Sequence, residues 1–341
     1  MRISGGVLAI IVALSGAGCA PGRSALLPED GGPRATAGTG SAGPGGTGPE
    51  LGQAGAITPG ATSPGEGGAG VVPGDATPGA TPVPGTASGT AYLALSPSAA
   101  EQARRLTLRL DRYLRKRPGR VSVAAYDRVT GMRYRYGGST PYRLADVAEV
   151  DILLVLLLRA QEHARRLTPL ERRLATWMIR MGDDRAARRL YTAVGGRSGL
   201  ARALRRLGIT HTRPSAGRRW KDTRSVADDQ LRVLDVLTSP KGPVNDRNRA
   251  FAAALLSSPH PARARGIAAA AAPRDRVAVK NGWHRVRRDR GGWTVNSAGR
   301  IISPSRDTLI TVLSDRNPGR RAGRATVERV ATMVMDEVRQ D

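Results

Sequence analysis

Hydrophobic and polar positions become regularly patterned only after about residue 96, where they predict a helix and then a β-hairpin. Residues 106–114 place leucine and tyrosine at helical spacing, and a Pro-Gly pair directly after them ends this helix. Segments 121–127 (VSVAAYD) and 132–136 (MRYRY) have the alternation and the residue types of strands, with a Thr-Gly turn between them.

The middle of the chain is predicted to be a helical region built around one buried helix. Residues 147–158 are nearly all apolar, so this helix must be covered on every side, and Asp146 lies in its N-cap position. Thr168 and Glu171 flank a proline in the pattern of a capping box, which predicts a second helix start. Further helices follow as far as about residue 256.

Strand patterns return near the C-terminus, and a last amphipathic helix follows them at about 324–338. The predicted strands are 277–280, 293–297, 300–303 and 308–313. Two strands, a helical middle, and then more strands with a final helix predict an α+β fold. We expect the outer strands to form one antiparallel sheet flanked by helices, with the middle helices as a helical subdomain.

The N-terminus has the layout of an export signal. An arginine precedes an apolar run at 7–14, which is too short to span a bilayer, and small residues then lead to Cys19, the only cysteine of the chain. This layout resembles a bacterial lipoprotein signal, in which the cysteine is lipidated. It predicts a signal peptide at 1–18, lipid attachment at Cys19, and an exported protein anchored to the cell membrane on its extracytoplasmic side. The alternative is ordinary cleavage and free secretion.

Residues 19–95 are predicted to be a disordered tether, and residues 96–341 the folded domain. The first of these segments consists largely of Gly, Pro, Thr, Ala and Ser and cannot bury a core. One cysteine excludes both a disulfide scaffold and a cysteine zinc site. No apolar run of about 20 residues follows the N-terminus, so no internal membrane span is expected.

The charge of the chain is strongly positive and is concentrated in the folded domain. Lys and Arg number 54 against 28 acidic residues, a formal charge of +26, and only three of the bases precede residue 96. Aromatic residues make up 4%, too few for a nucleic-acid surface with interleaved aromatics. Clusters at 285–290 and 316–324 favour anionic lipid headgroups, peptidoglycan or anionic wall polymers as partners. The alternative is a solvated arginine-rich surface without a partner.

Three short segments carry the candidate chemistry. Asp146-Val147-Ala148-Glu149 begins the buried helix, Gly182-Asp183-Asp184 follows a helix, and Lys280-Asn281-Gly282 lies on a late strand. In order and placement they resemble the Ser-x-x-Lys, Ser-Asp-Asn and Lys-Thr-Gly motifs of the class A β-lactamase and penicillin-binding family of serine hydrolases. The resemblance covers about residues 100–340, the whole folded domain.

The resemblance implies a cleft whose reactive groups are replaced. In the family, the serine of the first motif attacks the lactam carbonyl and the lysine helps to remove its proton. Asp146 and Glu149 stand at these places, and Ser-x-x-Lys occurs nowhere in the sequence. We expect a salt bridge from Lys280 to Asp146, and the added charge of Asp184 to weaken the binding of carboxylate ligands.

Other chemistry has little support in the sequence. Asp146 and Glu149 could act as an acid/base pair on a glycosidic bond, but carboxylates at this spacing on one helix are more often caps and salt-bridge partners. Ser297 has no base near it in the sequence. The four histidines are scattered without the spacing of metal ligands, so neither a metal nor a cofactor is expected: His163, His211, His260 and His284.

The sequence therefore predicts a membrane-anchored lipoprotein with a β-lactamase-like domain. We expect a catalytically inactive pseudoenzyme that acts as a binding or scaffold protein at the cell wall. Two alternatives stay open: an active serine hydrolase of the β-lactamase or peptidase class with another nucleophile, and a purely structural lipoprotein whose cleft is closed by a salt bridge of Lys280. The ligand and the oligomeric state are left open.

Overall fold

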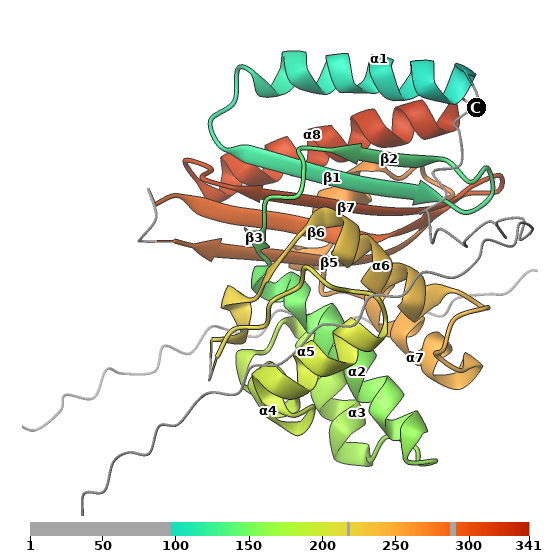
Figure 1. The fold of residues 1–341 in the computed structure, drawn as a ribbon, viewed down its shortest axis with the longest axis vertical. Coiled ribbons are helices and arrows are strands. Elements are labelled where there is room, and N and C mark those ends of the chain that lie inside the picture. The colour runs from blue at the N-terminus through green and yellow to red at the C-terminus, as the bar shows by residue number, and fades with distance from the viewer. Residues whose placement is uncertain (1–96, 217–218, 287–290, 341) are drawn as a thin grey trace, which may run out of the picture. The chain divides into compact units, whose positions relative to one another are not determined.

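The computed structural model describes residues 97–216, 219–286 and 291–340 (Figure 1). The predicted signal peptide, Cys19 and the tether to residue 95 lie outside the described residues, as does most of the 285–290 cluster. Among the described residues, no helix has the length and apolarity that crossing a membrane requires.

A five-stranded antiparallel sheet forms one half of the domain. Its spatial order is β2-β1-β7-β6-β5, so the N-terminal hairpin pairs with the C-terminal strands, and Val123 of β1 lies opposite Val312 of β7. This arrangement confirms the single antiparallel sheet that the sequence predicts. The strands are β1 (Arg120–Asp127), β2 (Arg133–Tyr136), β5 (Arg276–Arg285), β6 (Trp293–Ile302) and β7 (Asp307–Asp315), and a separate short pair is β3 (Tyr142–Arg143) with β4 (Arg224–Ser225).

Two helices from opposite ends of the domain cover one face of the sheet (Figure 1). They are α1 (Pro97–Leu114) and α8 (Arg320–Arg339). Leu106 and Leu110 of α1 pack with Val330 and Val334 of α8, all fully buried, in one cluster with residues of the sheet. Burial of such side chains contributes about 1.5–3 kcal/mol each, so this layer is a main source of stability.

The remaining helices form a second layer around α2 (Ala148–Glu162) (Figure 1). Eleven of the fifteen residues of α2 are buried, in agreement with its apolar sequence. Around it lie α3 (Pro169–Thr176), α4 (Asp184–Ala193), α5 (Gly196–Arg206), α6 (Ala227–Thr238) and α7 (Asp246–Leu256). The short helical turns are η1 (Ala145–Val147), η2 (Trp177–Met181), η3 (Trp220–Asp222), η4 (Pro261–Arg263) and η5 (Gly266–Ala270), and the last of these packs against α8 instead.

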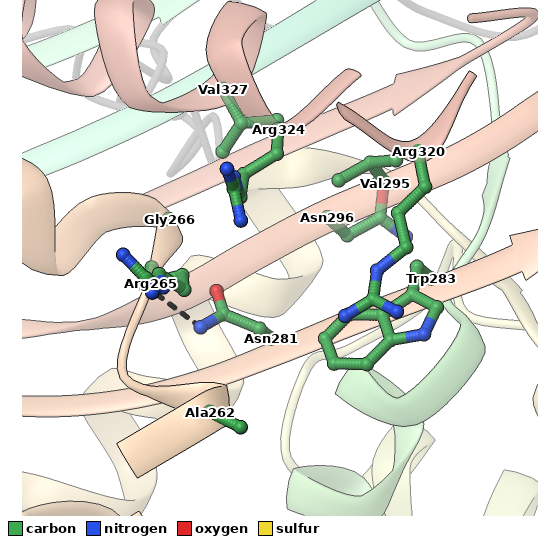
Figure 2. Close-up of a pocket in the computed structure, with 10 residues that line it drawn as sticks. All are labelled: Ala262, Arg265, Gly266, Asn281, Trp283, Val295, Asn296, Arg320, Arg324 and Val327. Atoms are coloured by element: carbon green, nitrogen blue, oxygen red, sulfur yellow. Dashed lines mark hydrogen bonds between the residues drawn. The ribbon is translucent and has the colours of Figure 1, made fainter. Parts of the chain in front are cut away.

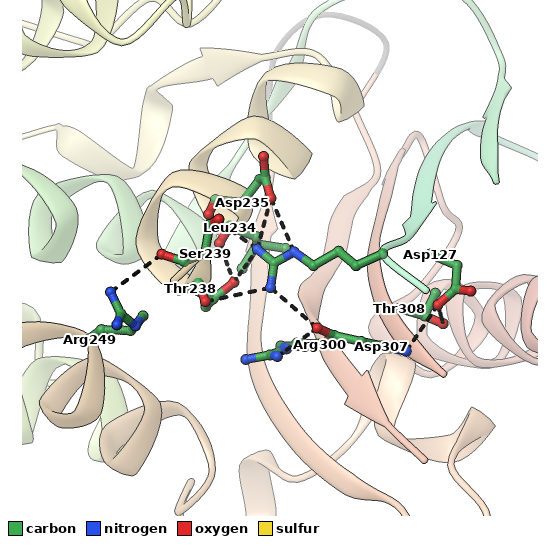
Figure 3. A network of polar contacts seen from close by, with 10 residues as sticks. Asp127, Leu234, Asp235, Thr238, Ser239, Arg249, Arg300, Asp307 and Thr308 are labelled. Atoms are coloured by element: carbon green, nitrogen blue, oxygen red, sulfur yellow. Dashed lines mark hydrogen bonds and ion pairs between the residues drawn. The ribbon is translucent and has the colours of Figure 1, made fainter. Parts of the chain in front are cut away.

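A polar network joins the helical layer to the sheet (Figure 3). Arg128, directly after β1, donates to Asp235 Oδ1 at 2.8 Å and to Thr238 Oγ1 at 2.9 Å, both on α6. The same guanidinium lies 3.5 Å from Asp307 Oδ2 at the start of β7. One side chain therefore links the hairpin, the last strand and the helical layer.

Three details of the predicted elements differ from the structure. The segments 293–297 and 300–303 are one continuous strand, β6, and α8 begins four residues earlier than predicted. Asp146 is not an N-cap: it lies in the 3₁₀ turn η1, and Val147 precedes α2 without a side-chain cap. By contrast, Thr168 and Glu171 form the predicted capping box.

Candidate functional site

The candidate site lies where η1 and the start of α2 meet strand β5. Gly282 of β5 makes this contact possible, since a Cβ atom there would lie 2.6 Å from the Asp146 backbone nitrogen. Ala145 has a positive φ of 51°, which costs free energy in a non-glycine residue and is common at functional sites. The backbone before Asp146 is therefore held in a strained conformation against the sheet.

Asp146 is buried and is neutralised by two cations. Its exposed fraction is 3%. Lys221 Nζ lies 3.0 Å from Oδ1, and Arg263 Nη1 lies 3.3 Å from Oδ2. Lys221 also pairs with Asp184 at 2.7 Å, so one ammonium joins two of the replaced motifs.

Glu149 and Lys280 form a second, deeper ion pair. Their side chains are 0% and 3% exposed, and Lys280 Nζ lies 2.5 Å from Oε2. Lys280 also donates to the carbonyls of Met178 and Ile179, at 3.2 and 3.0 Å. The expected bridge from Lys280 to Asp146 is therefore wrong. The partner of the lysine is Glu149, three residues after Asp146, in the first turn of α2.

Burial changes the acidity of Glu149. Loss of hydration raises its pKa to about 8, and the charge of Asp146 adds to this rise, while Lys280 opposes it. Glu149 is therefore protonated at pH values where an ordinary glutamate is ionised, and its contact with Lys280 becomes an ion pair as the pH rises above this pKa. Because it has no exposed surface, it has no access to a ligand in solution.

Gly182 leaves room for the side chain of Arg263. Its φ is 63°, and a Cβ atom there would lie 2.5 Å from the Arg263 guanidinium. The next residue, Asp183, caps α4 by accepting from the Ala186 backbone nitrogen at 2.7 Å. Thus Asp183 has a structural role, Asp184 pairs with Lys221, and the space over Gly182 is filled by an arginine.

Asn281 fixes the segment that carries Arg263. Its amide nitrogen donates to the carbonyls of Arg263 and Arg265, at 2.7 and 2.8 Å, and the second of these bonds is drawn in Figure 2. Its Oδ1 atom is buried and has no hydrogen-bond partner among the described residues. Asn281 therefore holds the residue that neutralises Asp146 and keeps one unused acceptor.

A cationic pocket adjoins this segment, between β5, β6 and α8 (Figure 2). Arg320 stacks on the indole of Trp283 at 3.8 Å, and Arg263 lies 5.1 Å from the same ring. The free space is about 20 Å³, enough for about one water molecule. Its lining is Ala262, Arg265, Gly266, Asn281, Trp283, Val295, Asn296, Arg320, Arg324 and Val327.

The charge of the cleft differs from the prediction. Asp146 and Asp184 share Lys221, Asp146 also binds Arg263, and further arginines line the adjoining pocket. The cations outnumber the two carboxylates. The charge of Asp184 is balanced by Lys221, and its expected effect on carboxylate ligands stays a prediction.

The polar residues around the site have structural partners. Within the part of the chain that the structure describes, no serine or threonine hydroxyl is hydrogen bonded to Asp146, Glu149 or Lys280. Ser297 is fully buried and accepts a hydrogen bond from the Ile267 backbone nitrogen at 2.9 Å. The described residues also contain no group of three His, Cys, Asp or Glu side chains that could hold a metal ion.

Lys221 and Arg263 are the residues that the sequence did not reveal. Both lie in short helical turns, η3 and η4, far along the chain from Asp146. The rarity of lysine could have indicated Lys221, because the sequence contains only four lysines, and two of them, Lys221 and Lys280, lie in this site. Arg263 had no such signal among the many arginines.

Comparisons with known proteins agree with this architecture. A family model described as the beta-lactamase enzyme family matches residues 167–338, which include the second and third motifs. Proteins named "Putative lipoprotein LppW" from Mycobacterium tuberculosis and Mycobacterium bovis are 30% identical over 219 residues, covering 62% of this chain and 69% of theirs.

Solved structures show the same fold at low sequence identity. A class A β-lactamase from Bacteroides cellulosilyticus superposes with a TM-score of 0.62 at 16% identity, over 70% of this chain and 99% of the other. A β-lactamase from Xanthomonas campestris also gives 0.62, at 18% identity, over 70% and 98%. The sheet, the buried helix, the family model and the LppW relatives agree with one another, and the chain belongs to the beta-lactamase enzyme family.

Proposed function

We propose that this protein is a catalytically inactive β-lactamase-fold lipoprotein that binds an anionic ligand at the cell envelope. The observation that carries the proposal is the position of Asp146. A carboxylate stands where the family has its serine, and Lys221 and Arg263 neutralise it from two sides.

Acyl transfer requires a nucleophile and a base within reach of each other, and the cleft provides neither. A carboxylate held between two cations is a weak nucleophile, because attack would break both ion pairs. Lys280 is bound to Glu149 and to two backbone carbonyls, so it has no free position from which to accept a proton. The buried Glu149 also makes glycosidic acid/base catalysis a poor fit.

Ligand binding is supported by the groups that remain. Trp283, Arg320 and Arg324 line the cationic pocket. Among the described residues, Arg324 Nε has no hydrogen-bond partner, and Glu328 Oε1 lies 3.7 Å from it. A carboxylate could accept bonds from the guanidinium groups if Arg320 moved away from the indole. The name of the LppW relatives supports a lipid-anchored place in the envelope. There, the carboxylate end of a peptidoglycan stem peptide is the natural candidate.

Intact mass after incubation with penicillin tests the inactive site. We expect no adduct on the whole chain, whereas a penicillin-binding protein used as the positive control gains one. In a second chain, Asp146→Ser and Glu149→Lys install the first family motif, Gly182→Ser installs the serine of the second, and Arg263→Ala removes the arginine that fills their space. An adduct on the unaltered chain would show a working hydrolase and would refute the proposal.

Titration with a D-alanyl-D-alanine-ending peptide tests the binding role. We expect Arg320→Gln to weaken binding at least about tenfold, because a charged hydrogen bond contributes roughly 1.5–3 kcal/mol. Arg329→Gln is the matched control, since Arg329 is an exposed arginine on the same helix. If the unaltered chain does not bind the peptide, the structural-lipoprotein alternative replaces the binding proposal.

A further inference from the structure

The longest one-signed stretch of the folded domain runs from α4 to the turn η3, where its last residue, Lys221, belongs to the candidate site. Between residues 185 and 221 the sequence has ten arginines and one lysine and no acidic residue. This stretch forms most of α4, all of α5 and the loop after it. Elsewhere in the domain acidic residues lie among the bases, so the positive charge is concentrated on these two helices.

Four of these arginines line an open groove. Arg197, Arg202, Arg205 and Arg213 surround a space of about 550 Å³ between α5 and the segment 210–214. All four are exposed, and none forms an ion pair with a described residue. Planar guanidinium groups bind phosphate oxygens through paired hydrogen bonds, so the groove fits phosphate groups.

An exposed apolar stripe lies on the neighbouring helix. Leu170, Trp177 and Met181 are 40%, 46% and 48% exposed, and their spacing of seven and four residues places them on one side of α3 and η2. The Arg173 guanidinium lies 5.7 Å from the Trp177 ring. Helix α3 packs against α4, the first of the two arginine-rich helices (Figure 1).

We propose that this end of the helical layer, called here the basic end, docks on the surface of an anionic phospholipid bilayer. Arginines contribute attraction to lipid phosphates, and a tryptophan with neighbouring aliphatic side chains enters the headgroup region. A nucleic acid fits less well, because the aromatic residues Tyr191 and Trp220 within the stretch are buried and offer no stacking surface. The inference does not depend on the function of the cleft.

Vesicle co-sedimentation tests the proposal. The whole chain with Cys19→Ser carries no acyl group, so any membrane binding must come from the protein itself. We expect binding to vesicles of phosphatidylglycerol and phosphatidylcholine and at least about tenfold weaker binding to phosphatidylcholine alone. Replacing Arg197, Arg202, Arg205 and Arg213 by glutamine is expected to lower binding at least about tenfold.

A second set of four substitutions is the matched control. Arg104, Arg112, Arg115 and Lys116 lie on or directly after α1, are exposed, and are at the opposite end of the domain (Figure 1). Their replacement by glutamine removes the same charge and is expected to change binding less than about threefold. An equal loss in both sets would show a general effect of net charge and would overturn the proposal.

The apolar stripe has its own control. Trp177→Ser is expected to lower the binding that persists at high salt, whereas Leu108→Ser removes an apolar side chain, 56% exposed, from α1 and is expected to leave that binding unchanged. Equal effects of the two substitutions would contradict insertion at Trp177. Binding to soluble polyphosphate without binding to either vesicle would exclude a membrane surface.

Discussion

Arg263 contacts all three of the replaced motifs. It pairs with Asp146, its guanidinium lies over Gly182, and its backbone carbonyl accepts a hydrogen bond from Asn281. These contacts depend on one another, since a side chain at position 182 would displace the guanidinium and leave the buried Asp146 with one cation instead of two. The three motif segments therefore form one set of mutually compatible residues.

Gly182→Ser is predicted to destabilise the protein through Arg263. We expect the free energy of unfolding to fall by about 2–4 kcal/mol, because the new side chain adds positive-φ strain and breaks a buried ion pair. Gly208→Ser is the control: its φ of 74° is similar, but no atom lies within 4 Å of the added Cβ. That substitution is expected to cost only about 1 kcal/mol. Equal losses in urea unfolding would contradict the role of Arg263.

Two buried carboxyl groups predict an unusual dependence of stability on pH. Burial raises the pKa of Glu149 to about 8, from an ordinary value of 4.5, and that of Asp151 to about 8, from 3.8. At a pH between the ordinary and the raised pKa values, both carboxyl groups are protonated in the folded protein and ionised in the unfolded chain. The contribution of these two groups to stability is therefore greatest at low pH and falls as pH rises through this window, by on the order of 1 kcal/mol per pH unit for each group.

Urea unfolding between about pH 5 and 8 measures this slope. Asp151→Asn provides the comparison, because the amide has nearly the same shape as the acid and lies beside the same partner, Gln230. We expect it to remove about half of the slope. A stability that is flat or rises with pH in the unaltered protein would show that both carboxyl groups are ionised in the folded state.

The short turn η1 is held closely by the sheet. Strand β5 approaches it at Gly282, and Asn296 of β6 donates to the carbonyls of Arg143 and Leu144, at 2.7 and 3.0 Å. The start of α2 is thereby held by two strands at once. This explains how a strained residue, Ala145, persists directly before Asp146.

Gly282→Ala is predicted to separate η1 from β5. The added Cβ would lie 2.6 Å from one backbone nitrogen and 2.8 Å from the Leu144 carbonyl, and backbone atoms cannot move aside as a flexible side chain can. We expect a loss of at least about 2 kcal/mol in the free energy of unfolding. Gly319→Ala, with nothing within 4 Å of its added Cβ, is expected to stay within about 0.5 kcal/mol. Similar losses would mean that the close approach is unimportant.

For the whole molecule, the hydrophobic pattern predicted the order of helices and strands well. Each helix or strand must bury its own apolar face, so the pattern can be read within a short segment. The hairpin, the buried helix and the capping box at Thr168 all appear where the sequence places them. The ion pairs were not predictable in the same way. Asp146 meets Arg263 across 117 residues, and its choice of partner depends on where two short turns lie after folding. In the same way, the position of Lys280 on β5 determines that it pairs with Glu149 and not with Asp146.

The space over Gly182 also restricts how this protein could evolve. A serine at position 146 would leave Lys221 and Arg263 without their shared carboxylate, a lysine at 149 would face Lys280, and a serine at 182 would meet Arg263. Each single change toward the family motifs thus meets a neighbour suited to the present residues. Installing those motifs requires several substitutions made together, because the effect of each one depends on the others, which is epistasis.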